Sequence, residues 1–71
     1  MTNTEYQNAK AAICDGIPIT DSIYEALKDL NKQYQTHIKS CVKRNDIAQA
    51  MYFKQEQFEI QNLIEKAVIQ A

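Results

Sequence analysis

Apolar side chains recur every three or four residues between positions 21 and 44 of this 71-residue chain. Such spacing predicts an amphipathic α-helix with one buried face. The steps alternate between four and three residues, as they do along a helix that packs lengthwise on another helix. Lysine and glutamine side chains lie on the opposite face of this predicted helix. The apolar positions are Ile23, Ala26, Leu27, Leu30, Tyr34, Ile38 and Cys41.

A second apolar pattern starts after Asp46, and it is out of phase with the first. A continuous helix keeps its apolar stripe in phase, whereas here the stripe shifts by more than about 90°. Asn45 tolerates the left-handed conformation that ends a helix, and Asp46 can cap the next helix together with Gln49. The sequence therefore predicts an all-α fold with a long antiparallel helical hairpin, residues about 21–44 and 46–70. The alternative is one continuous rod.

A short N-terminal helix is expected at about residues 4–15, packed on the hairpin within a single domain, 1–71. Both Thr2 and Thr4 fit its N-terminal capping box. Gly16 can adopt the left-handed conformation at its end. The apolar linker 17–19 should lie against the hairpin, and either Thr20 or Ser22 should cap the next helix.

The helix predicted at 46–70 carries two apolar rows, which one neighbouring helix cannot cover together. We expect the helix at 21–44 to cover the first row and the N-terminal helix to cover part of the second. The remaining apolar surface is a candidate contact for a protein partner or a second copy, since soluble monomers rarely expose such a set. Tyr52, off both rows, joins the candidates because tyrosine is favoured at interfaces. The first row is Ala50, Phe53, Ile60, Ile64 and Val68; the second is Ile47, Met51, Phe58 and Ile69.

The charge balance argues against general nucleic-acid binding. The formal net charge is −1, whereas such binders usually carry a basic surplus. One basic cluster, Lys39, Lys43 and Arg44, could contact phosphates. Cations in this position also compensate the dipole at a helix C-terminus, and we favour that explanation.

Catalytic and metal-binding patterns are incomplete. His37 and Cys41 have the spacing of two metal ligands on one helix face, but the chain has no second histidine. The only cysteine–histidine combinations lack a glycine-rich turn for an oxyanion hole. We expect no enzyme activity, no metal, no cofactor and no small-molecule substrate. Whether Cys14 and Cys41 are free or bridged stays open.

These observations predict a non-enzymatic protein that acts by stoichiometric protein–protein contact as an adaptor, inhibitor or regulator, and as a homodimer. The alternatives are a nucleic-acid-associated regulator that uses the basic cluster, or a structural subunit of a larger assembly. The polar first residues and the absence of a ~20-residue apolar run predict a cytoplasmic protein without a membrane span. Small helical proteins of this type are common in phages and mobile elements.

Overall fold

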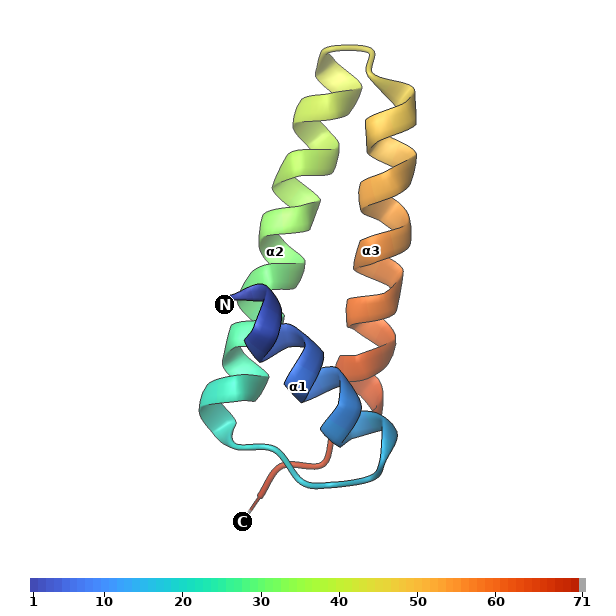
Figure 1. Cartoon of the computed structure of the whole chain (residues 1–71). Coiled ribbons are helices and arrows are strands. Elements are labelled where there is room, and N and C mark those ends of the chain that lie inside the picture. The colour runs from blue at the N-terminus through green and yellow to red at the C-terminus, as the bar shows by residue number, and fades with distance from the viewer. Residues whose placement is uncertain (71) are drawn as a thin grey trace.

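The computed structural model describes residues 1–70 and contains three α-helices, α1 (Asn3–Cys14), α2 (Asp21–Lys43) and α3 (Ile47–Lys66). Helices α2 and α3 lie antiparallel as a hairpin, and α1 crosses the half of the hairpin that is remote from its turn (Figure 1). The molecule is elongated, 43 × 20 × 18 Å. The predicted all-α hairpin is confirmed and the continuous rod is excluded.

Each helix starts with a side chain that accepts a hydrogen bond from a backbone amide three residues later. Thr2 Oγ1 accepts from Glu5 N at 3.2 Å, and Thr20 Oγ1 accepts from Ile23 N at 3.3 Å. These caps satisfy amides that have no partner within the first helical turn. Of the two capping candidates, the structure uses Thr2 rather than Thr4 at α1 and Thr20 rather than Ser22 at α2.

The hairpin turn consists of Arg44, Asn45 and Asp46. Asn45 has φ 61°, the left-handed conformation that asparagine tolerates. The Asn45 amide donates to the Val42 carbonyl at 3.0 Å, and the Asp46 amide donates to the Cys41 carbonyl at 2.8 Å. This is the Schellman arrangement, which pairs carbonyls at a helix end. Asp46 Oδ1 then accepts from Gln49 N at 3.3 Å, so the residue that closes α2 also caps α3.

Helix α1 ends in the same way at Gly16, which has φ 75°. The Gly16 amide donates to the Ile13 carbonyl at 3.1 Å and the Ile17 amide donates to the Ala12 carbonyl at 2.8 Å. A Cβ atom at Gly16 would meet no atom within 4 Å. Glycine is therefore suited to this position by its backbone freedom and not by lack of space.

The main core lies where α1, the linker and both hairpin helices converge. Leu27 is completely buried there, packed with Ile13, Ile19 and Leu63. The remaining buried apolar residues continue along the interior of the fold. They are Ala9, Ile38, Cys41, Ala50 and Ile60.

Aromatic and amide side chains join α2 and α3 nearer the turn. The Phe53 ring lies 5.7 Å from the Tyr34 ring and stacks on His37 at 5.4 Å between centroids. Gln57 Nε2 donates to Gln35 Oε1 at 2.9 Å. The first predicted row of α3 therefore faces α2 as expected, apart from its last member, Val68.

Helix α3 ends at Lys66, four residues before the predicted end. Ala67 is extended, and residues 68–70 run beside the linker as a parallel bridge between Ile19 and Ile69. The Ile19 amide donates to the Val68 carbonyl at 2.8 Å, and the Gln70 amide donates to the Ile19 carbonyl at 2.7 Å. These bonds pair backbone groups of a linker that has no helical partners. Val68 and Ile69 consequently leave the helical rows to which the pattern assigned them.

The expectation that α1 covers part of the second row of α3 is wrong. Ile13 of α1 packs with Leu63, and Lys10 forms an ion pair with Glu59. Leu63 and Glu59 lie on a side of α3 where the second row has no residue. The reason is that Leu63, which the apolar rows did not include, is the α3 residue in the main core.

Within the linker, Ile19 is buried as predicted, whereas Ile17 is 54% exposed.

We expect Asp46→Ala to lower the free energy of unfolding by about 1 kcal/mol, because it removes the cap of α3. Chemical denaturation followed by circular dichroism measures this loss. Asn45→Gly is the matched control, since glycine adopts the left-handed conformation freely and should change stability by less than about 0.5 kcal/mol. If Asp46→Ala unfolded with the same free energy as the wild type, Asp46 would not have the capping role assigned to it.

Candidate functional site

Three large apolar side chains form a row on the outer face of α3. Ile47 is 54% exposed, Met51 is 59% exposed and Phe58 is 68% exposed. At 3.6 residues per turn, the three fall within about 40° of the helix circumference. Ile60, only 1% exposed, lies about 160° from Phe58 by the same geometry. We call Ile47, Met51 and Phe58 the outer row; it faces away from the core.

The other two candidate interface residues are not in the outer row. Tyr52 is exposed but lies about 100° around the helix from Met51, on the flank that α1 approaches. Its ring meets Phe53 edge-on, with centroids 5.5 Å apart. Ile69, 42% exposed, belongs to the extended segment beside the linker.

The basic cluster lies at the hairpin turn. Lys39, Lys43 and Arg44 are all exposed, and Arg44 Nη2 donates to Cys41 Sγ at 3.5 Å. Lys43 is in the last turn of α2, where a cation interacts favourably with the helix dipole.

Charge is distributed unevenly along the hairpin. The tip, residues 35–57, holds four basic and two acidic side chains. The remainder of the chain holds four basic and seven acidic side chains. The molecule is therefore positive at the turn and negative at the opposite end, although its net charge is only −1.

The sulfur and imidazole groups do not assemble into a reactive centre. Cys14 is exposed and Cys41 is buried, and both thiols are free. His37, four residues from Cys41, is stacked on Phe53. Within residues 1–70, no three side chains of the His, Cys, Asp and Glu types come together to hold a metal ion.

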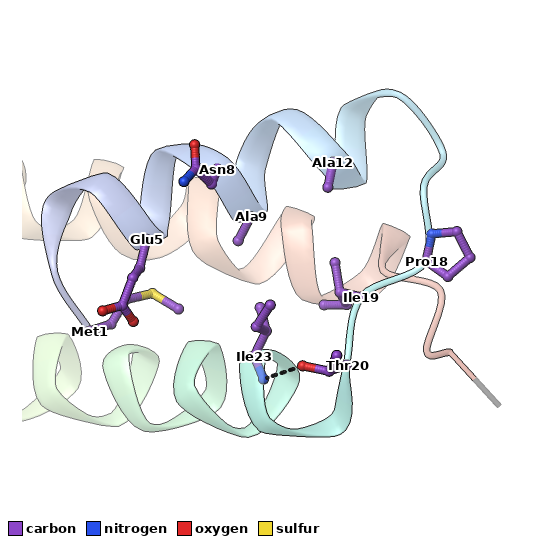
Figure 2. Close-up of a pocket in the computed structure, with 9 residues that line it drawn as sticks. All are labelled: Met1, Glu5, Asn8, Ala9, Ala12, Pro18, Ile19, Thr20 and Ile23. Carbon is purple, nitrogen blue, oxygen red and sulfur yellow. Dashed lines mark hydrogen bonds between the residues drawn. The ribbon is translucent and has the colours of Figure 1, made fainter.

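An apolar pocket of about 330 Å³ separates α1 from the start of α2. Figure 2 shows Ala9 and Ala12 of α1 on one side and Ile23 of α2 on the other, with Pro18 and Ile19 of the linker at one end. The pocket exists because α1 packs on α3 and makes fewer contacts with α2. Its alanine side chains leave the space unfilled.

A second pocket, of about 250 Å³, is polar and has walls from all three helices. Its lining contains three tyrosines, one glutamate and further polar side chains near the N-terminus. Helix α1 supplies Tyr6 and Gln7, α2 supplies Leu30 and Tyr34, and α3 supplies Tyr52 and Glu56, with residues 1–3 completing the wall. We call this the tyrosine pocket.

Burial and negative charge together raise the pKa values of two tyrosines of the pocket, Tyr6 and Tyr34. Burial, followed by the charges of Glu59 and Glu56, raises the pKa of Tyr6 to about 12. Burial and then Glu56 also raise the pKa of Tyr34. The Tyr6 hydroxyl is shielded from solvent and has no hydrogen-bond partner among residues 1–70. Glu59 is near enough to affect the Tyr6 hydroxyl, but the two groups do not have the geometry of a hydrogen bond.

The tyrosine pocket was not anticipated from the sequence. The four-residue spacing of Tyr52 and Glu56 places them on one face of α3, which is the only local signal. Nothing in the sequence shows that Tyr6 and Tyr34 come to the same place, because this depends on where α1 crosses the hairpin.

No protein family, curated protein or solved structure matches this chain. None of the helices in residues 1–70 combines the length and apolar character needed to cross a membrane.

We expect Tyr6 to ionise near pH 12, well above the ordinary value of 10.0. The unfolded chain would lose this proton near pH 10 and the folded chain only near pH 12, so folding stability should fall as pH rises between those values. Absorbance titration of tyrosinate in wild type and Tyr6→Phe should assign the high step to Tyr6. If Tyr6→Phe still showed an ionisation step near pH 12, the assignment would be wrong. The same would hold if its folding stability fell between pH 10 and pH 12 as that of the wild type does.

Proposed function

We propose that this protein has no catalytic activity and acts by stoichiometric protein–protein contact through the outer row of α3, which pairs with a second copy of the chain. The observation that carries the proposal is the exposure of Ile47, Met51 and Phe58, each more than half accessible on one face of a long helix. Single exposed apolar residues are ordinary, whereas an aligned set marks an interaction surface.

The energetic argument starts from the small size of the domain. At 71 residues, apolar burial and lost chain entropy nearly cancel, and small helical proteins commonly gain stability by association. Full burial of a large apolar side chain contributes roughly 1.5–3 kcal/mol. Because α1 and α2 lie elsewhere around α3, neither of them supplies this burial to the outer row.

The charge distribution favours an antiparallel pair. Two copies aligned side by side in the same direction would place two positive tips together and two negative ends together. Antiparallel alignment centred on the outer row instead separates the two turns and places each one beside residues 59–65 of α3 in the other copy, which include Glu59 and Glu65. A two-fold axis across α3 achieves this with one surface that contacts itself, the commonest form of homodimer.

An adaptor, inhibitor or regulator is the role that such a surface supports, with the outer row available to a partner when the dimer dissociates. The cytoplasm is the compartment we propose, because free thiols persist in a reducing environment and both cysteines are free.

We expect Met51→Glu and Phe58→Glu to dissociate the dimer while helicity stays near the wild-type value, because both residues are exposed in the single copy. Ile60→Glu should instead unfold the protein, since it places a charge in the core. Gln33→Glu, an exposed change of the same charge on α2, is the matched control and should have no effect. Analytical ultracentrifugation together with circular dichroism measures both properties.

A monomeric wild type would overturn the proposed self-association. Unfolding of Met51→Glu and Phe58→Glu as severe as that of Ile60→Glu would show that the outer row belongs to the core. Assemblies larger than a dimer at micromolar concentration would support the alternative of a structural subunit.

The exposed basic cluster favours a second candidate, a regulator bound to nucleic acid. We expect no saturable binding to duplex DNA. Lys43 interacts with the dipole of α2, and the chain outside residues 35–57 carries more acidic than basic side chains. Fluorescence anisotropy at two salt concentrations tests this. Binding through three phosphate contacts would weaken by about 40-fold between 50 and 200 mM salt. Saturable binding with that slope, lost in Lys39→Gln/Lys43→Gln, would support the second candidate.

A further inference from the structure

One charged side chain, that of Lys54, lies within the outer row of α3. Lys54 follows Met51 by three residues and precedes Phe58 by four. Because Met51 in turn follows Ile47 by four, the outer row and Lys54 together have the spacing of a seam between two packed helices. At 3.6 residues per turn, Lys54 lies about 20° around the helix from Ile47. Lys54 is exposed and occupies the middle of the apolar surface.

The charge of Lys54 is uncompensated within residues 1–70. Neither of the two ion pairs found there involves Lys54. On a helix, an acidic partner would be three or four residues away, and those positions hold only alanine, methionine, glutamine and phenylalanine. Glu56, two residues further on, lies about 160° around the helix. The ammonium group of Lys54 therefore acts on whatever covers the outer row.

A second copy of the chain would bring the same charge to this surface. In the antiparallel pair, a two-fold axis midway along the outer row places Ile47 opposite Phe58 of the second copy. The same axis places Met51 opposite Lys54 of the second copy. The two Lys54 residues then lie on either side of the axis, about 4.5 Å apart along the helix direction. Their aliphatic stems can cover the methionines, but their ammonium groups repel each other.

We propose that Lys54 selects the partner of the outer row: it weakens the pairing of two identical copies and favours an amphipathic helix that brings a carboxylate to the facing position. Such a helix keeps the apolar contacts and replaces a repulsion by an ion pair. A single lysine in a helix-packing seam is known to fix register and oligomeric state at a cost in stability, and discrimination of this kind uses repulsion as well as attraction. This inference rests on the proposed function, because the antiparallel pair defines the facing position.

A copy of this protein with Lys54→Glu is the probe, because it offers the same apolar row with a carboxylate at the facing position. Wild type labelled with a fluorophore at the exposed thiol of Cys14 reports association through fluorescence anisotropy. We expect wild type and Lys54→Glu to associate roughly tenfold or more tightly than two copies of either protein, because only the mixed pair avoids like charges at the axis. Added salt should reduce this preference, since exposed charges are screened.

Lys32→Glu is the matched control for the change of charge. Lys32 is exposed on α2 and lies about 180° around that helix from the buried Cys41, so it faces away from α3. A mixture of wild type and Lys32→Glu should associate as two wild-type copies do.

Lys54→Leu provides a second test in a single protein. It removes the charge and completes the apolar row, so we expect two copies of this variant to associate roughly tenfold or more tightly than two wild-type copies. Circular dichroism should stay unchanged, because position 54 is exposed.

Equal affinities of wild type for itself and for Lys54→Glu would overturn the role of Lys54. Dissociation by Met51→Glu would in that case still support self-association through the outer row. A wild type that stayed monomeric but paired with Lys54→Glu would support the role of Lys54 and overturn the homodimer. If no combination associated, including Lys54→Leu with itself, both proposals would be wrong.

Discussion

The fold depends on a three-residue turn in which two helix ends share one residue. Asp46 donates its amide to the Cys41 carbonyl at the end of α2 and accepts the Gln49 amide at the start of α3. The left-handed backbone of Asn45 makes the bond to Cys41 possible. Because the turn is so short, α2 and α3 must lie antiparallel and in contact. The stacking of Phe53 on His37 and the Gln57–Gln35 hydrogen bond follow from the register that it sets.

Helix α1 determines what remains exposed. It packs against the Glu59 and Leu63 flank of α3, so α3 has neighbours on two sides and none on its outer row. The same position encloses the tyrosine pocket, whose walls include α1, and leaves the apolar pocket between α1 and α2. The exposure of the outer row and the presence of both pockets therefore follow from the docking of a single twelve-residue helix.

Local signals in the sequence were sufficient for the helices and the hairpin. Caps and left-handed positions depend on residues within a few places of one another, so Thr20, Gly16, Asn45 and Asp46 could be interpreted directly. The side of α3 that α1 approaches could not be predicted, because the apolar rows did not include Leu63. The early end of α3 could not be predicted from the sequence either. It depends on hydrogen bonds between Ile19 and residues 68–70, about 50 positions apart in the chain.

That bridge has a consequence for the order in which the chain folds. Contacts between α2 and α3 next to the turn span few residues and can form first, whereas joining residue 19 to residue 69 closes a loop that contains the whole hairpin. The bridge can form only after the hairpin has brought the ends of this loop together. We therefore expect the bridge to form late in folding and to open before the turn does. The amide protons of Ile19 and Gln70 report the opening and closing of the base of the molecule, independently of the turn at its tip.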